Sequence, residues 1–188
     1  MSSIIDDAAA GVLPEWTCAS PKRRAHIARV AQLMGTWAAE FAPEQAPHWT
    51  AAAWLHDALR DADPDTLRQV VDRDFKEWPD ALLHGPAAAA RIRREEPAAP
   101  RNILNAVAYH TVGHNCLDTL GRALYLADYL EPGRKFDLAG RATLRDRVPR
   151  EFNAVLREVA GARIAHLTKA GSPVRPETAG FWQSIGEA

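Results

Sequence analysis

The chain is poor in cysteine, and it has neither a long apolar run nor an excess of charge of one sign. Its only two cysteines, Cys18 and Cys116, form no CxxC pattern, which excludes a disulfide scaffold and favours a reducing compartment. No apolar run approaches the roughly 20 residues of a membrane span, and the acidic N-terminus lacks the basic start of a signal peptide. We therefore expect a cytoplasmic protein without a membrane partner.

The charge balance also argues against nucleic acid as a partner. The formal net charge is -1 and the isoelectric point is near 6.7, so no overall basic field exists to attract a polyanion. The short clusters "KRR" and "RIRR" are typical of solvated helix faces. Hydrophobic residues make up 47% of the chain and charged residues 25%, as in ordinary globular domains. The six tryptophans suit a core or an interface, so a homodimer stays open.

Alternating strand patterns are nearly absent, whereas apolar residues recur every three or four positions. Ser20 and Pro21 predict a helix start, and an amphipathic stripe follows: Ile27, Val30, Met34, Trp37 and Phe41. Further helices are predicted at about 49–59, after Pro64, over "RNILNAVAYH" and "CLDTLGRALYLADYL", and at about 150–166. Since Pro86 disfavours helical geometry at Gly85, a helix is expected to end or bend just after His84.

These patterns predict a single all-α domain, a helical bundle with short loops. We expect the domain to span residues 20–170, with an N-terminal extension at 1–19. The remaining segment, 171–188, is rich in Pro and Gly and is expected to form a C-terminal tail.

Six polar residues lie on otherwise apolar helices or at their ends: His26, His56, Asp57, His84, His110 and Asp128. Burying an unpaired carboxylate is costly, so Asp128 in "LYLADYL" needs a cation, a strong donor or solvent. Mixed imidazole and carboxylate ligands suit iron, zinc or manganese. Neighbouring residues on a helix diverge by about 100°, and one metal above the arc between His56 and Asp57 satisfies both.

Taken one at a time, these residues have simpler interpretations. A lone His-Asp pair is more often structural or exposed, and His84 beside Gly-Pro could equally cap a helix end. The ordered set on separate helices favours a divalent metal centre instead.

That ordered set resembles the HD-domain superfamily of all-α, metal-dependent phosphohydrolases. The stretch "AYHTVGHNCLDTLGRALYLADYLEPGRKF" is similar to the YqeK-type branch, and "ADYLEPGR" is its most specific part. "RRAH", "AAAWLHDALR" and "HGP" match that branch in the same order. Members are described as symmetrical bis(5'-nucleosyl)-tetraphosphatases, which bind iron and split diadenosine tetraphosphate into two ADP.

The resemblance implies a role for each matching residue. It makes His26, His56, Asp57 and Asp128 the metal ligands. It places His84 and His110 in the same pocket, as ligands of a second metal or as donors to substrate phosphate, so that with Asp57 they form the catalytic group. Iron is the implied metal, with manganese or another transition metal as alternatives, and a metal-bound water is the implied attacking group.

The resemblance also implies a set of substrate contacts. Arg23 and Arg134 would bind the nucleotide phosphates, and Thr111 and Gly113 would offer hydroxyl and backbone contacts. Two residues depart from the family pattern. His114 stands where the family commonly has Arg, and Arg60 stands where it often has Lys, which leaves the effect on phosphate binding open.

Two other functions remain open from the sequence. The nearer one is an HD-domain nucleotidase or deoxynucleotide phosphohydrolase, which His114 keeps in play. A non-catalytic nucleotide-binding regulator is less favoured, because the metal set is intact. The symmetry of the cut is implied by the resemblance alone, and the sequence does not separate one metal ion from two.

Overall fold

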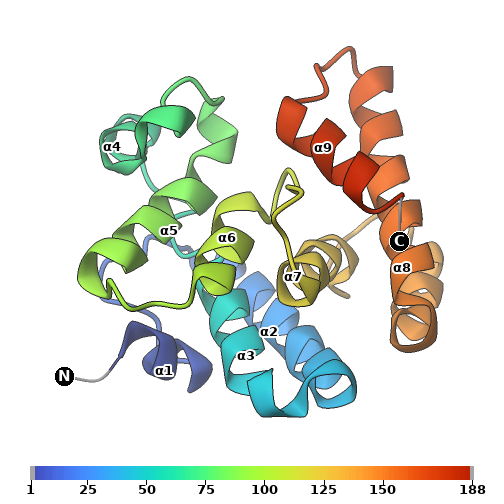
Figure 1. Ribbon diagram of the computed structural model, residues 1–188, viewed down its shortest axis with the longest axis horizontal. Helices are drawn as coiled ribbons and strands as arrows, with labels where there is room; N and C mark the ends of the chain where they lie inside the picture. The colour runs from blue at the N-terminus through green and yellow to red at the C-terminus, as the bar shows by residue number, and fades with distance from the viewer. Residues whose placement is uncertain (1–2, 187–188) are drawn as a thin grey trace.

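The computed structural model describes residues 3–186. Over these residues the chain forms nine α-helices, three short 3-10 turns and no β-strand (Figure 1), which confirms the predicted all-α class. The helices are, in chain order, α1 (Ile4–Ala9), α2 (Pro21–Phe41), α3 (Ala46–Leu55), α4 (Pro64–Val70), α5 (His84–Glu95), α6 (Arg101–Tyr109), α7 (Thr119–Leu130), α8 (Leu138–Lys169) and α9 (Pro176–Ser184). Among the described residues, no helix is both long and apolar enough to cross a membrane.

Helix α2 forms as its sequence predicts. Ser20 caps its N-terminus by accepting a hydrogen bond from the backbone N–H of Arg23, and Pro21 occupies the first turn, where a missing N–H costs nothing. The predicted stripe faces the core and packs against α3 and α7. At its end Phe41 stacks on Trp49, the first large residue of α3, with ring centroids 6.2 Å apart.

Helix α3 ends at Leu55, four residues earlier than predicted. The next segment turns away because it pairs with the chain that precedes α2. The N–H of Cys18 donates to the carbonyl of Ala58 at 2.8 Å, and the N–H of Asp61 donates back to the carbonyl of Cys18 at 3.1 Å. His56 is therefore the C-cap of the helix and Asp57 lies in the turn that follows.

Helix α5 begins at His84, whereas the sequence predicted that a helix would end or bend there. Pro86 falls in the first turn, where it removes no intrahelical hydrogen bond. Gly85 is needed because a Cβ at this position would lie 2.7 Å from the carbonyl oxygen of Val107. The start of α5 thus approaches the backbone of α6 closely, and His84 is brought beside the end of that helix.

The C-terminal half differs most from expectation. Helix α8 begins at Leu138, earlier than predicted, and is kinked at Glu151, just after Pro149. The expected tail contains α9, which packs on α8. Thr178 of α9 donates a hydrogen bond to the carbonyl of Val112 at 2.8 Å.

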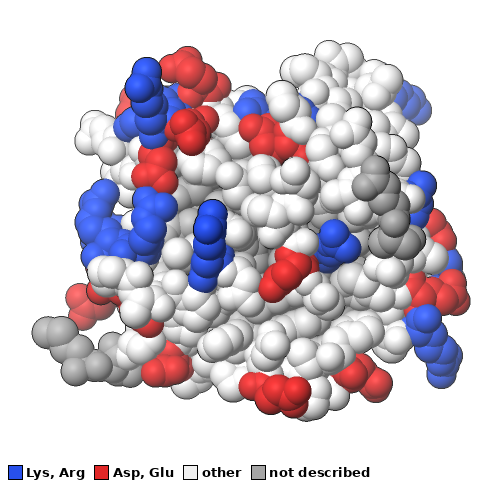
Figure 2. Space-filling model, in the orientation of Figure 1, with Lys and Arg blue, Asp and Glu red and all other residues white. Residues whose placement is uncertain are grey.

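The arrangement places α4 and α5 on one side of the molecule and α8 and α9 on the other, with α6 and α7 between them (Figure 1). Figure 2 shows that Lys and Arg on this face gather mainly over α4 and α5, with acidic side chains among them, while the surface over α9 carries few charges.

Candidate metal centre

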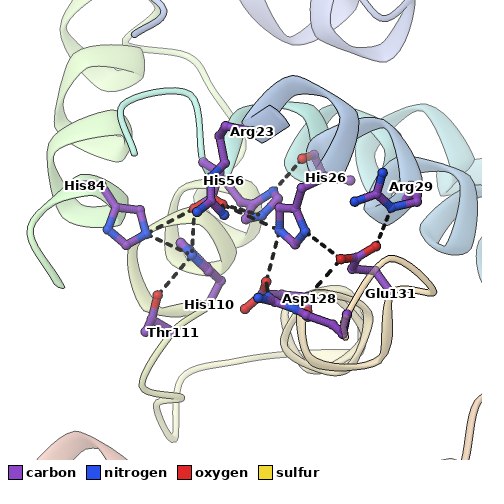
Figure 3. A network of polar contacts seen from close by, with 12 residues as sticks. Arg23, His26, Arg29, His56, His84, His110, Thr111, Asp128 and Glu131 are labelled. Carbon is purple, nitrogen blue, oxygen red and sulfur yellow. Dashed lines mark hydrogen bonds and ion pairs between the residues drawn. The ribbon is translucent and has the colours of Figure 1, made fainter. Parts of the chain in front are cut away.

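All six polar residues singled out in the sequence are buried, and the structure brings them into one cluster (Figure 3). His26 comes from α2 and Asp128 from α7. The remaining four lie at helix ends: His56 and Asp57 after α3, His84 at the start of α5, and His110 after α6. Helix ends from separate parts of the chain therefore supply most of the cluster.

The carboxylate of Asp57 lies at the centre of this cluster. Five nitrogens surround it: His84 Nε2 at 3.1 Å and His110 Nε2 at 3.5 Å from Oδ1, and Arg23 Nη1 at 2.6 Å, His26 Nε2 at 3.5 Å and His56 Nε2 at 3.5 Å from Oδ2. At the end of α3 the side chains of His56 and Asp57 turn into the same space, so these two neighbours in the sequence both contribute to one cluster.

Helix α7 presents two carboxylates to His26. Asp128 Oδ1 lies 3.1 Å from Nε2 of the ring, and Glu131 Oε1 lies 3.2 Å from Nδ1. Each carboxylate accepts a hydrogen bond from an arginine: Arg134 donates to Asp128 at 2.5 Å and Arg29 donates to Glu131 at 2.5 Å, while Nε of Arg134 also lies 3.8 Å from Glu131. The sequence reasoning missed Glu131, although it lies within "ADYLEPGR", about one helical turn after Asp128.

The other three imidazoles are held in one orientation by backbone carbonyls. In each case Nδ1 lies close to the carbonyl oxygen three residues earlier: His56 to Ala53 at 2.6 Å, His84 to Ala81 at 3.1 Å and His110 to Val107 at 2.9 Å. With the proton on Nδ1, each Nε2 carries a lone pair that faces the cluster. The same second contact orients histidines in metal sites.

The donor set fits a divalent metal ion. Nε2 of His56 is buried without a hydrogen-bond partner among the described residues, and Nε2 of His26, although 3.1 Å from Asp128 Oδ1, forms no hydrogen bond there either, which is costly for polar atoms. The ligand atoms of His26, His56 and Asp128 lie within 4.8 Å of one another. Those of His56, Asp57 and His110 do the same, so a cation here would satisfy the unpaired nitrogens.

The ionisation states of Asp57, Asp128 and His84 also suit metal binding. Burial alone would raise the pKa of Asp57 and of Asp128, but the imidazoles, with Arg134 beside Asp128, outweigh it and lower both pKa values. Burial lowers the pKa of His84 to about 4, so its ring is neutral near pH 7. Ionised carboxylates and neutral imidazoles are the forms that bind metals.

The cluster meets a cleft of about 1000 Å³ at Asp128, which forms part of the cleft wall. Thr111, Asp128 and Arg134 lie in the wall beside the cluster, and the remainder is lined by side chains from α7, α8, the segment before α5 and the segment before α9, among others. The hydroxyl of Thr111 lies 3.0 Å from Nε2 of His110. Thr111 and Arg134 are thus placed where the sequence reasoning expected substrate contacts.

The other expected contact residues are placed differently. Arg23 pairs with Asp57 at the cluster. Within the described chain, Arg60, Gly113 and His114 lie outside the walls of the cleft. Gly113 has a φ of 74° and faces the ring of Phe181.

His114 has local contacts instead. Its ring stacks on Tyr109, with centroids 4.3 Å apart, and its Nδ1 accepts a hydrogen bond from the backbone N–H of Cys116 at 3.0 Å. These contacts fix the loop between α6 and α7.

Known proteins resemble this chain along most of its length. Residues 23–133 match the profile of the HD domain family. The chain is 27% identical over 139 residues to a protein of Halalkalibacterium halodurans named symmetrical bis(5'-nucleosyl)-tetraphosphatase, covering 71% of this chain and 73% of that one. It is 30% identical over 132 residues to a Bacillus subtilis protein of the same name, covering 68% and 70%.

A solved structure shares the fold. It is described as a predicted HD superfamily hydrolase involved in NAD metabolism from Clostridium acetobutylicum, and it superposes with a TM-score of 0.76. The match covers 97% of this chain and 95% of that one, at 22% sequence identity. The helices that carry the cluster therefore belong to a recurring arrangement.

Proposed function

This chain belongs to the HD domain family, and from that premise we propose that it is a metal-dependent phosphohydrolase that splits diadenosine tetraphosphate symmetrically into two ADP. The observation that carries the proposal is the buried cluster of four imidazoles and two carboxylates, which meets the cleft at Asp128. The names of the two aligned bacterial relatives support the substrate and the symmetry.

We assign the metal, with iron as the first choice and manganese as the second, to His26, His56, Asp57 and Asp128. When bound, such an ion would polarise a phosphoryl oxygen and lower the pKa of water, so that water could act as a nucleophile near neutral pH. Arg23 and Arg134 hold the two carboxylates in place. Their remaining N–H groups can bind phosphate oxygens in the bidentate manner of guanidinium.

His84 and His110 offer acceptors rather than donors. Their Nε2 atoms lie 3.2 Å apart, and both rings direct Nδ1 at a backbone carbonyl. Two lone pairs at this separation repel unless a cation or a proton lies beside them. The geometry therefore favours the pair as ligands of a second metal ion over the pair as donors to substrate phosphate.

The cleft suits a polyphosphate with bulky ends. Its volume of about 1000 Å³ is at the upper limit of small-molecule sites, roughly 300–1,000 Å³. Arg134, Arg163 and Arg175 are among its lining residues, and they supply positive charge along a path that leads away from the metal cluster. A dinucleotide can therefore lie with its phosphates at the cluster and a nucleoside in the cleft.

The test is product analysis with defined metals. The protein is loaded with iron, and separately with manganese, and incubated with diadenosine tetraphosphate, and the products are resolved by anion exchange. We expect ADP alone, and none from the His56→Ala, Asp57→Ala double variant. AMP plus ATP would refute the symmetrical cut. Cleavage of nucleoside mono- or triphosphates with diadenosine tetraphosphate left intact would replace the proposal with a nucleotidase.

A further inference from the structure

One wall of the cleft contains a charged side chain that the proposed chemistry does not use. Arg141, near the start of α8, lies between two aromatic rings. Its guanidinium carbon is 4.0 Å from the ring centroid of Tyr129 and 4.1 Å from that of Phe136. Its Nε donates to the carbonyl of Phe136 at 3.2 Å. All three side chains line the cleft that begins at Asp128.

Arg141 is buried without an ion-pair partner among the described residues. The residue is 2% exposed, and its Nη1 has no hydrogen-bond partner among the described residues. No carboxylate of the described chain forms an ion pair with it. Arginine stays protonated even when buried, and an unpaired buried charge is strongly unfavourable. Such a group at the wall of a ligand cleft is best explained by an anion that binds there.

Phe136 is unusual in the opposite way to Arg141, because it is an apolar residue that is exposed. It is 62% exposed although it lines the cleft. One face of its ring lies against Arg141, and the remaining surface is open to solvent. Nucleotide-binding sites combine an exposed aromatic ring with a nearby cation. The base stacks on the ring, and the cation can bind phosphate.

We propose that Phe136 and Arg141 form a nucleotide subsite, in which Phe136 stacks on the base and Arg141 binds a phosphate of the same nucleotide. The choice of a dinucleotide as the full ligand rests on the proposed function, whereas the subsite itself takes any nucleoside diphosphate. Because every base presents a π-face, stacking here tolerates different bases. The subsite therefore sets affinity for the nucleoside end, separately from the groups that hold the metal.

The test compares two ligands that share a diphosphate and differ in the nucleoside. Metal-loaded protein is titrated by calorimetry with ADP and with methylenediphosphonate, whose P–C–P bridge resists hydrolysis. In Phe136→Ala we expect ADP to bind about tenfold more weakly and methylenediphosphonate to bind as in the wild type. Arg141→Met should weaken both ligands by similar factors, and Phe136→Tyr should restore ADP binding.

Leu138→Ala is the matched control, because Leu138 is 60% exposed, lies two residues from Phe136 and is not part of the cleft wall. It should change neither affinity. Metal content and circular dichroism check that Arg141→Met is folded. If it is not, Arg141→Lys, which keeps the charge, takes its place in the comparison of the two ligands. Unchanged ADP binding in Phe136→Ala, or equal weakening of both ligands, would overturn the subsite.

The two proposals fail in different ways. If wild-type protein binds ADP through Phe136 but leaves diadenosine tetraphosphate intact, the subsite stands and the proposed reaction is wrong. If the protein hydrolyses the dinucleotide and Phe136→Ala leaves KM unchanged, the reaction stands and the subsite is wrong.

Discussion

His26 directs its Nδ1 at Glu131, 3.2 Å away, and this contact turns its Nε2 toward Asp128 on the same helix. One imidazole is thus held between two carboxylates three residues apart, Asp128 in the last turn of α7 and Glu131 at its C-cap. Arg29 fixes the outer carboxylate through a hydrogen bond of 2.5 Å. The side chain of Glu131 is only 2% exposed, so this orienting contact is shielded from competing water.

We expect Glu131→Gln to weaken metal binding by about 10- to 100-fold, the usual effect of removing a group that orients a histidine ligand. The amide keeps the shape but loses the charge that holds the ring. Metal affinity is measured by competition with a chromogenic chelator. Glu158→Gln is the control, because Glu158 also pairs with an arginine, Arg147, but on the exposed surface of α8. Equal affinities for wild type and Glu131→Gln would contradict the orienting role.

Removing the metal should lower stability without unfolding the protein. The ion would neutralise two buried carboxylates, Asp57 and Asp128, whereas the apolar core is continuous without it. A ligand at 100 times its dissociation constant stabilises by about 2.7 kcal/mol. We therefore expect chelator-treated protein to keep its helical circular dichroism, to melt at a lower temperature, and to regain the higher Tm when iron or manganese is added. An unchanged Tm would argue against the cluster as the metal site.

Local sequence chemistry predicted the parts of the fold that depend on neighbouring residues. Ser20 and Pro21 mark the start of α2 because a cap acts within one turn. The cluster residues were recognisable because polar groups stand out among apolar ones, and the structure does bring all six together.

Features that depend on distant contacts were not predictable in this way. The early end of α3 depends on the pairing of Ala58 with Cys18. The role of Glu131 depends on its meeting with His26 from another helix. Helix α9 is short and follows a Pro-rich stretch, so the packing of Phe181 against Gly113, rather than intrinsic propensity, accounts for it.

In metal-free protein, the stability contributed by the contact between Glu131 and His26 should depend on pH with two limbs. Burial would raise the pKa of Glu131, but hydrogen bonds from His26 and Arg29 lower it from 4.5 to about 2. That stabilisation is fully present above pH 4.5 and is lost as the pH falls towards 2. For His26, burial would lower the pKa, but Asp128 and Glu131 raise it above 6.5. That stabilisation is present below pH 6.5 and is lost as the pH rises through the raised value.

We therefore expect the contribution of the Glu131–His26 contact, measured as the difference in urea unfolding free energy between wild type and Glu131→Gln, to be greatest between about pH 4.5 and 6.5. Glu131→Gln should flatten both limbs. It removes the carboxylate whose pKa is lowered, and it removes one of the carboxylates that raise the pKa of His26. Parallel pH profiles for the two proteins would show that the contact contributes no such stability.

Two glycines, one that packs against α9 and one within it, should respond in opposite ways to replacement by alanine. Gly113 has a φ of 74°, and a Cβ there would overlap the ring of Phe181. The left-handed backbone alone costs about 1–2 kcal/mol for an L-residue, so Gly113→Ala should destabilise by at least that amount and loosen α9. Gly180 lies inside α9, and a Cβ there would meet no atom elsewhere in the described chain within 4 Å. Gly180→Ala should therefore stabilise by about 0.5–1 kcal/mol.

Urea unfolding of the two variants checks both signs, and limited proteolysis of the segment after Lys169 reports on α9 directly. Because Thr178 also ties α9 to Val112, beside the cleft residue Thr111, loosening this helix should also alter the cleft. Gly113→Ala is thus expected to raise KM for the nucleotide substrate, while Gly180→Ala leaves it unchanged. A stable Gly113→Ala protein with protected α9 would mean that the Phe181 contact does not hold this helix in place.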